Sequence, residues 1–221
     1  MLLQKLISFV APYSCLSCGR ESNLICTQCL PALAVTKRSS CFLCNKLTAE
    51  FRTCTACRRK TKLAGVIIAS HYESHVKNLI RRLKYNQAQT AAPLLVQIVL
   101  PHIPMGGFDI VTGVPASTRR FRQRGYNQAA LLAKAVACAR NLPYIETLGR
   151  TGHSRQVGTS RLQRWQQLQG AFYVRSPRLI NGTRILIVDD VVTTGATLSE
   201  CAKILKKAGA RSVWSAAIAK H

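Results

Sequence analysis

Two neighbouring carboxylates, Asp189 and Asp190, follow an aliphatic run and precede a loop of small and hydroxyl-bearing residues. Residues 185–188 read Ile-Leu-Ile-Val, a pattern typical of a parallel strand buried on both faces. The loop leads into an expected helix over residues 198–208, which a glycine ends. Backbone N–H groups of residues 194–197 would point outward at the start of this helix, where the helix dipole favours an anion.

The acid pair (Asp189 and Asp190) and the threonine loop (residues 193–197, Thr-Thr-Gly-Ala-Thr) suit different parts of one ligand. Carboxylates repel phosphate, but they accept hydrogen bonds from sugar hydroxyls or bind Mg²⁺. A ribose at the acids with its 5′-phosphate in the threonine loop satisfies both groups. An ordinary strand-to-helix turn is the alternative, and the fixed spacing of acids and threonines favours the ligand site. Because no Gly-Lys-Ser/Thr follows, the stretch predicts a sugar-phosphate site and excludes a nucleoside-triphosphate P-loop.

Composition predicts a folded and strongly basic protein. The chain of 221 residues has room for one domain of ordinary size and a small module, and 48% hydrophobic residues suffice for a packed core. Its net charge of +24 comes from 32 basic and 8 acidic residues. Nucleic acid or an anionic membrane surface would be attracted to such a charge. A basic proteome or a small anionic substrate is the alternative, but one sugar-phosphate site needs only a few cations, so a polyanion is favoured.

Eight of the ten cysteines fall in four C-x-x-C pairs, which are Cys15/Cys18, Cys26/Cys29, Cys41/Cys44 and Cys54/Cys57. A disulfide framework would need an oxidising compartment, and thioredoxin-like chemistry would need a βαβ context for each pair. Paired C-x-x-C motifs instead predict two structural zinc ions, each held by four thiolates. Sequential pairing, within 15–29 and within 41–57, closes shorter loops than a crossed arrangement, which stays the alternative.

The chain start carries apolar residues at i, i+3 and i+4 spacing over residues 1–11, which predicts a short amphipathic helix packed on the protein. This segment lacks the cleavage site of a secretion signal, and no stretch is long enough to span a bilayer. We therefore expect a cytoplasmic protein, with the inner face of the membrane as the other location considered. A charged run over 58–62 predicts a hinge after the cysteine-rich segment.

The remaining pattern alternates strands and helices, which predicts an α/β fold with a doubly wound, mostly parallel sheet and the site at the carboxyl ends of its strands. Expected strands cover 64–72, 108–115, 145–151 and 213–219, and expected helices cover 75–84, 91–102 and 127–140. The helix over 75–84 has one apolar face and one basic face. The basic face would be either solvated or in contact with phosphates. Cys138 and Cys201 are expected to be buried small hydrophobic residues.

Two further segments could bind anions. Arg119, Arg120, Arg122 and Arg124 follow the strand over 108–115, and arginine forks suit diphosphate oxygens, with Arg122 and Arg124 the preferred pair. The polar, basic run over 152–161 suits a mobile lid over a phosphorylated substrate. His153 in this run is more often an exposed loop histidine than an acid or base, and Trp165 would either stack on a base or anchor the lid.

These residues carry a family resemblance. Residues 185–197 resemble the phosphoribosyl-pyrophosphate (PRPP) signature of type I phosphoribosyltransferases, and the whole chain, cysteines included, resembles the ComF/GntX family of DNA-uptake-associated proteins with this fold. The proline loop (residues 114–117, Val-Pro-Ala-Ser) resembles the family's pyrophosphate loop, and R-x-R-G-Y-N-Q over 122–128 resembles a family segment. Gln156, Arg164 and Gly170-Ala171-Phe172 match a further pattern, from which Thr159 and Gln167 depart.

The resemblance implies a type I phosphoribosyltransferase domain over 63–221, preceded by a double zinc ribbon over 1–62, and binding of PRPP with Mg²⁺. Asp189, Asp190 and Thr193 would be the catalytic residues, and Thr193 occupies a place where some purine-specific relatives carry an acidic base. The implied PRPP-binding residues are Asp189, Asp190, Val191, Thr193, Thr194, Gly195, Ala196, Thr197, Pro115, Ala116, Ser117, Arg122 and Arg124.

Two functions are compatible with this implied site. One is ribosyl transfer to an unknown acceptor, in which Mg²⁺ and the arginines stabilise the leaving pyrophosphate. The other is a PRPP- or DNA-binding accessory protein of DNA uptake that uses the fold without turnover. Single-stranded DNA, a DNA-uptake helicase and other competence proteins are the expected partners besides PRPP.

Overall fold

The structure, a computed structural model, describes residues 14–34, 39–85, 88–151, 168 and 170–221, and the side chains at 88 and 89 are not considered. Three predictions lie outside these residues: the amphipathic helix over 1–11, the lid over 152–161 with His153, and Gln156, Thr159, Arg164, Trp165 and Gln167. Within the described part of the chain, none of the helices combines the length and the apolar character needed to cross a bilayer.

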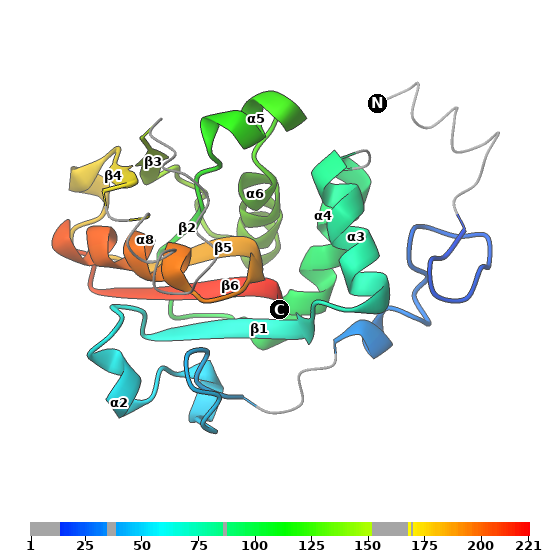
Figure 1. The fold of residues 1–221 in the computed structure, drawn as a ribbon, viewed down its shortest axis with the longest axis horizontal. Helices are drawn as coiled ribbons and strands as arrows, with labels where there is room; N and C mark the ends of the chain where they lie inside the picture. The colour runs from blue at the N-terminus through cyan, green and yellow to red at the C-terminus, as the bar shows by residue number, and fades with distance from the viewer. Residues whose placement is uncertain (1–13, 35–38, 86–87, 152–167, 169) are drawn as a thin grey trace.

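Four parallel strands form the central sheet in the order β1-β6-β5-β2 (Figure 1). Their bounds are β1 Gly65–His71, β2 Ile110–Gly113, β5 Arg184–Val192 and β6 Ser212–Lys220. β5 lies between two neighbours, and Ile185 to Val188 are completely buried, as their aliphatic run predicts. Tyr144 makes a single parallel bridge to Val111 on the outer side of β2.

Helices cover both faces of this sheet, which confirms the doubly wound fold. Their bounds are α3 Ser74–Tyr85, α4 Ala88–Val99, α6 Gln128–Arg140 and α8 Ala196–Lys207. On one face α4 packs on β1 and β6, α6 packs on β2 and β5, and α3 packs on α4. Alternate residues of β5 separate the two cores: Leu186 and Val188 join the core with α3, α4 and α6, whereas Ile185 and Ile187 join the core with α8.

Short elements complete the chain. They are η1 Pro31–Leu33, η2 Ala49–Phe51, α2 Thr55–Arg58, η3 Leu100–His102, α5 Thr118–Arg124, β3 Leu148–Arg150, β4 Phe172–Val174 and η4 Pro177–Leu179. β3 and β4 pair antiparallel beside the main sheet. α5 is a seven-residue helix that the sequence pattern does not predict. The hydroxyl of Ser117 caps it by accepting a hydrogen bond from the N–H of Arg120, 3.3 Å away.

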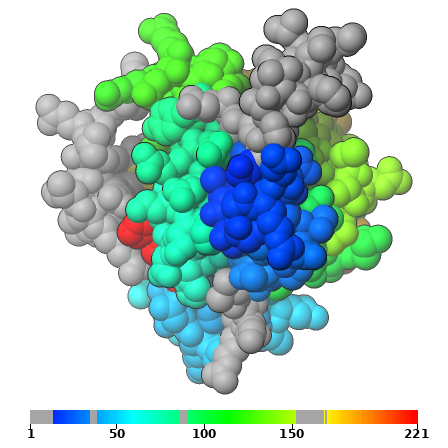
Figure 2. Space-filling view, turned by 90° about the vertical axis from the view of Figure 1, so that its right-hand side faces the viewer, coloured from blue at the N-terminus to red at the C-terminus, as the bar shows by residue number. Residues whose placement is uncertain are grey.

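The cysteine-rich segments pack against the sheet domain at two different places (Figure 2). Leu24, Ile25 and Leu33 of the first ribbon (residues 14–34) join the core that contains α3 and α4. Phe42 of the second ribbon (residues 39–58) joins the opposite core, which contains α8. The charged run over 58–62 is not a free hinge as predicted, because Thr61 is buried and its hydroxyl lies 2.9 Å from that of Ser199.

The two remaining cysteines differ in exposure. Cys201 lies on α8 and is completely buried, as predicted. Cys138 is exposed, so the prediction of a buried residue was wrong. The buried side of α6 is formed by Leu132, Ala133, Val136 and Ala137, and residue 138 lies past the edge of that stripe.

A charged clamp joins the amino ends of β2 and β5. Asp109 accepts two hydrogen bonds from the guanidinium of Arg184, at 2.6 and 3.1 Å, and a third from the Arg184 backbone N–H at 2.8 Å. These bonds lower the pKa of Asp109 to about 2. The clamp lies at the amino ends of the strands, and the acid pair lies near the carboxyl end of β5. The clamp therefore supports the strand pairing and does not contact the candidate site.

Replacing Asp109 by Asn tests the clamp. Since the pKa of Asp109 is lower in the folded than in the unfolded protein, its contribution to stability is present above about pH 4 and is lost as the pH falls through about 2. At neutral pH, we expect Asp109→Asn to lower the free energy of unfolding by about 1 kcal/mol or less, because the pair is partly exposed. Urea unfolding near neutral pH and near pH 3 measures the difference, and a difference that does not shrink in acid would contradict this origin.

Candidate functional site

The carboxyl edge of the sheet brings the acid pair next to the proline loop. Gly113, the last residue of β2, is in register with Val188, and the N–H of Val114 donates to the carbonyl of Val188 at 3.1 Å. The proline loop therefore leaves the sheet directly beside the acid pair. β5 continues to Val192, four residues past the predicted aliphatic run over 185–188, so the acid pair lies on a stretch of β5 that projects past the end of β2.

Gly113 is required at this position by the approach of α6. A Cβ atom at residue 113 would lie 2.8 Å from the backbone of Ala129 and of Ala130, closer than packed atoms come. Since these neighbours are backbone atoms, no side-chain movement relieves the contact. A glycine at the end of β2 thus lets the first turn of α6 press against the strand from which the proline loop departs.

Each carboxyl group of the acid pair is held by the backbone that follows it. One Asp189 oxygen accepts from the N–H of Asp190 at 2.8 Å, and one Asp190 oxygen accepts from the N–H of Val191 at 2.9 Å. Asp190 is only 6% exposed, and its other oxygen lies 2.8 Å from the ammonium of Lys84. Burial, together with the neighbouring charge of Asp190, raises the pKa of Asp189 well above its usual value.

Lys84 is a site residue that the sequence analysis did not select. It lies in the last turn of α3, where the sequence pattern indicated only a basic helix face. Its side chain is 20% exposed in contact with a carboxylate that is 8% exposed, so this ion pair is largely withdrawn from water. No signal in a single sequence could pair residues 84 and 190, because only the tertiary fold brings the last turn of α3 to the acid pair.

The threonine loop joins β5 to α8 through a left-handed residue. Gly195 is the N-cap of α8 with φ +73°, and the hydroxyl of Thr194 accepts from the N–H of Ala196 at 3.4 Å. Thr193 is exposed at the tip of the loop, while Thr194 and Thr197 are half-buried. The loop thus places three threonines, one of them exposed, at the start of a twelve-residue helix, where the helix dipole favours an anion.

The predicted arginines lie on α5, at the upper edge of Figure 1, rather than in a loop. Arg122 is exposed on this helix. Arg124 lies over the ring of Tyr85, with its guanidinium carbon 5.3 Å from the ring centre. Its Nε and Nη1 atoms are buried and have no hydrogen-bond partner among the described residues. Because Lys84 and Tyr85 are adjacent, the end of α3 contacts both the acid pair and the arginine helix.

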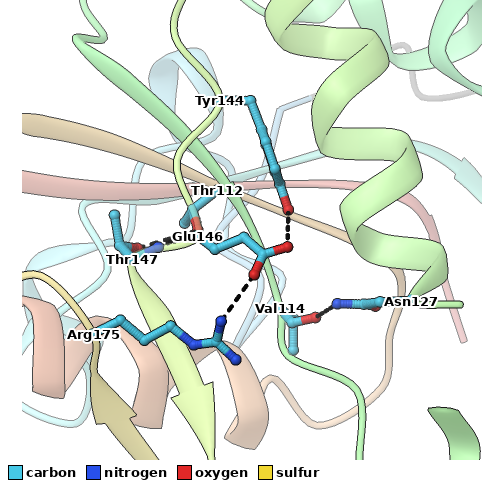
Figure 3. Close-up of polar contacts among 7 residues, drawn as sticks. All are labelled: Thr112, Val114, Asn127, Tyr144, Glu146, Thr147 and Arg175. Atoms are coloured by element: carbon cyan, nitrogen blue, oxygen red, sulfur yellow. Dashed lines mark hydrogen bonds and ion pairs between the residues drawn. The ribbon is translucent and has the colours of Figure 1, made fainter.

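The Gly-Tyr-Asn-Gln segment after α5 fixes these elements in place. The hydroxyl of Tyr126 donates to the carbonyl of Leu83 at 2.5 Å, which ties the segment to α3. The amide of Asn127 donates to the carbonyl of Val114 at 3.0 Å (Figure 3). Its oxygen accepts from the N–H of Ala129 at 3.1 Å. Asn127 therefore caps α6 and holds the proline loop with one side chain, so the role of this segment is structural.

A cavity of about 310 Å³ opens beside the proline loop. Its wall includes Pro115, Ala116, Phe121, Tyr144, Glu146, Arg150 and Arg175. The carboxylate of Glu146 is held at 3.0 Å by the guanidinium of Arg175 and at 3.3 Å by the hydroxyl of Tyr144 (Figure 3). Burial and the nearby charge of Arg120 lower the pKa of Arg150. Pro115 and Ala116 thus line a cavity whose charged residues are two arginines and one glutamate, and the acid pair is not part of its wall.

The eight paired cysteines form two separate groups of four, in the sequential arrangement. They are Cys15, Cys18, Cys26 and Cys29 in the first ribbon and Cys41, Cys44, Cys54 and Cys57 in the second. Within each group all sulfur atoms lie within 4.8 Å of one another, and two pairs are 3.8 and 3.6 Å apart. Tetrahedral zinc with bonds of about 2.3 Å separates its sulfur ligands by about 3.8 Å, so both groups fit this ion.

Backbone donors favour the thiolate at one cysteine of each group, Cys15 and Cys41. Burial by itself would raise the pKa of Cys15, but N–H donors from Cys26, Cys18 and Ser17 outweigh it and lower the pKa. The same balance lowers the pKa of Cys41. Metal binding requires deprotonated cysteine, so backbone donors around the sulfur atoms are what a structural zinc site needs.

Comparison with known proteins agrees with this architecture. The chain is 30% identical over 216 residues to competence protein F of Haemophilus influenzae, covering 86% of this chain and 94% of that protein. It is 31% identical over 203 residues to DNA utilization protein YhgH of Salmonella typhimurium, covering 86% and 87%. The chain belongs to the ComF/GntX family. This family membership confirms the resemblance inferred from the motifs.

Within this ComF-family chain, residues 124–221 match the phosphoribosyl transferase domain family. Competence protein ComFC of Streptococcus pneumoniae is a more distant relative, 23% identical over 220 residues and covering 90% of this chain and 96% of that protein. Among solved structures, adenine phosphoribosyltransferase from Thermoanaerobacter pseudethanolicus aligns with 61% of this chain and 82% of its own at 16% identity and a TM-score of 0.39.

The metal content of the purified protein tests the two cysteine groups. We expect about two zinc ions per chain by elemental analysis, since each group offers four sulfur ligands. Cys18→Ser and Cys44→Ser should each remove about one zinc, because each takes a thiolate from one group only. Cys138→Ser is the control, as an exposed cysteine outside both groups, and should keep both ions. Absence of zinc together with disulfides in the mass spectrum would contradict the assignment.

Proposed function

We propose that this ComF-family protein binds PRPP with Mg²⁺ at the carboxyl edge of its sheet. The observation that carries the proposal is the convergence there of three elements from distant parts of the sequence. The acid pair supplies acceptors for ribose hydroxyls or Mg²⁺. The threonine loop supplies N–H and hydroxyl donors for the 5′-phosphate. The proline loop leaves the sheet beside the acid pair and supplies a place for the diphosphate.

The stretch of β5 past β2 is where we place the ribose. Neighbouring side chains of a strand point to opposite faces of the sheet. Both carboxyl groups can therefore reach one ligand only if that ligand lies beside the strand, where a neighbouring strand would otherwise pair. β2 does not pair with β5 beyond Val188, so this side of β5 is not occupied by β2. Mg²⁺ belongs in the proposal because PRPP is a polyanion and the neighbouring carboxylates would otherwise repel it. Lys84, already paired with Asp190, offers a further positive charge.

Arg122, Arg124 and Ser117 would meet the diphosphate. Arg124 supports this role because its Nε and Nη1 atoms are buried without a partner among the described residues, a state that an anionic ligand would relieve. In a transfer reaction these cations would stabilise the leaving pyrophosphate, and Thr193 would face the acceptor without acting as a base. Retention of PRPP without turnover is the alternative mode.

Replacing the acid pair tests this assignment. We expect Asp189→Asn/Asp190→Asn to weaken binding of Mg²⁺–PRPP by at least tenfold, because a hydrogen bond to a charged group contributes about 1.5–3 kcal/mol. Isothermal titration calorimetry with the intact protein measures the affinity. Asp109→Asn is the matched control: it removes a carboxylate from the opposite edge of the same strands and should leave the affinity within about twofold. Equal affinity of wild type and double variant would exclude the acid pair.

A role in DNA uptake is the second part of the proposal. Relatives that share most of this chain's length are named for competence and for DNA utilization. We propose that the protein binds single-stranded DNA without sequence preference, in the cytoplasm, beside a helicase or other competence proteins. On α5 the exposed ring of Phe121, 51% exposed, stands among the exposed Arg119, Arg120 and Arg122. Such a surface suits base stacking combined with phosphate contacts.

Fluorescence anisotropy with a labelled dT oligomer tests the α5 surface. We expect Phe121→Ala to weaken binding by about 1–3 kcal/mol, because the ring no longer stacks on a base. Arg119→Gln/Arg120→Gln should reduce the slope of log affinity against log salt, by about 0.7 for each phosphate that the variant no longer neutralises. Excess Mg²⁺–PRPP should compete, since α5 adjoins both surfaces. Arg58→Gln/Arg59→Gln is the comparison: if this pair weakens binding and the α5 variants do not, DNA binds at the second ribbon.

A further inference from the structure

The second ribbon touches the threonine loop. Phe42 lies between two predicted zinc ligands, Cys41 and Cys44, and its side chain is 3% exposed. A Cβ atom built at Gly195 would lie 2.4 Å from the ring of Phe42, so the ring stands directly over the α-carbon of this glycine. Gly195 is the left-handed residue from which α8 starts. A residue of the cysteine-rich segment therefore forms one wall of the candidate phosphate site.

Polar contacts hold the second ribbon and the residues just after it beside the threonine loop. The ammonium of Lys220 donates to the carbonyl of Phe42 at 3.0 Å and to the side-chain oxygen of Asn45 at 2.5 Å. Lys220 is in register with Val192, the residue just before the loop. On the other side, the buried hydroxyls of Thr61 and Ser199 are hydrogen-bonded, and Ser199 lies in the first turn of α8.

The first ribbon offers a built-in comparison. Its buried residues Leu24, Ile25 and Leu33 pack in the core with α3 and α4, on the other face of the sheet. The second ribbon packs Phe42 in the core with Leu198, Cys201 and Leu205 of α8. Both ribbons hold four cysteines at similar spacing, yet only the second adjoins the threonine loop in the described part of the chain.

We propose that the second ribbon is a positioning element of the sugar-phosphate site, with Phe42 as the residue through which it acts. This inference rests on the proposed function of the threonine loop. A metal bound by Cys41 and Cys44 fixes the short segment that carries Phe42, and the ring then confines Gly195 to the left-handed conformation that starts α8. The N–H groups of the loop are thereby oriented before a phosphate arrives, which lowers the entropic cost of binding. Occupancy of this one metal site thus controls affinity for a phosphorylated ribose.

Three variants of the full chain distinguish an action of the second ribbon through Phe42 from a general effect of losing a zinc ion. Cys44→Ser disrupts the second site, Phe42→Ala removes the ring while leaving all eight ligands, and Cys18→Ser disrupts the first site. Cys18 and Cys44 are matched, because both are exposed and both end the first C-x-x-C pair of their ribbon. Phe42→Leu keeps an apolar side chain and serves if Phe42→Ala does not fold.

Two measurements on each variant test the inference. In hydrogen–deuterium exchange, without ligand, Cys44→Ser and Phe42→Ala should speed exchange in peptides spanning residues 192–199, and Cys18→Ser should leave it unchanged. In calorimetry, the first two variants should bind Mg²⁺–PRPP about tenfold more weakly than wild type, and Cys18→Ser should stay within about twofold. Phe42→Leu should fall between wild type and Phe42→Ala in both measurements.

The two measurements fail independently. If the wild type does not bind Mg²⁺–PRPP, the proposed function is wrong, while the exchange data still report whether the ribbon orders the loop. Unchanged exchange over 192–199 in Phe42→Ala and Cys44→Ser overturns the positioning role. Equal effects of Cys18→Ser and Cys44→Ser on exchange and affinity would also overturn it, because zinc would then act on the whole fold rather than through Phe42.

Discussion

The position of β5 is the constraint on which the candidate site depends. β5 is buried between β6 and β2, and its alternate residues fill two different cores. A shift of one residue would move Leu186 and Val188 to the wrong face, so the register is strongly fixed. That register sets how far β5 extends beyond β2, and the acid pair lies within this extension. The location of two carboxylates is thus determined by aliphatic packing elsewhere along the same strand.

Burying acids in this way requires compensation, and α3 supplies it. An unpaired carboxylate with the low exposure of Asp190 would be costly, and the ion pair with Lys84 offsets that cost. The same helix end carries Tyr85 beneath Arg124 and accepts a hydrogen bond from Tyr126. The last turn of α3 therefore sets the charge balance of the acid pair and holds the segment that follows α5. The end of α3 thus takes part both in the candidate site and in the packing around it.

The cysteine-rich segments have different relations to the sheet domain. Each contributes apolar side chains to a larger core, which a segment of this size needs because its own apolar surface is small. The first ribbon covers α3 and α4, away from the threonine loop, and only its packing is evident. The second reaches the start of α8 through Phe42, whose carbonyl accepts from Lys220 of β6, and Thr61, just after the ribbon, is hydrogen-bonded to Ser199. Two ribbons with the same ligands thus contact the sheet domain differently: in the described residues only the second packs in the core with α8, and its Phe51 also packs against the core with α3 and α4.

The sequence by itself determined the features that are local along the chain. The aliphatic run before Asp189 indicated a buried strand, the threonine loop a helix start, and the four C-x-x-C pairs two metal sites in sequential order, because each depends on residues a few positions apart. The exposure of Cys138 and the helix at α5 were missed, since weak periodicity and short length leave little signal. Only the tertiary structure decided the rest. Lys84 meets Asp190, Phe42 covers Gly195 and Glu146 meets Arg175 because packing joins residues that are remote in sequence, and one sequence carries no record of such pairs.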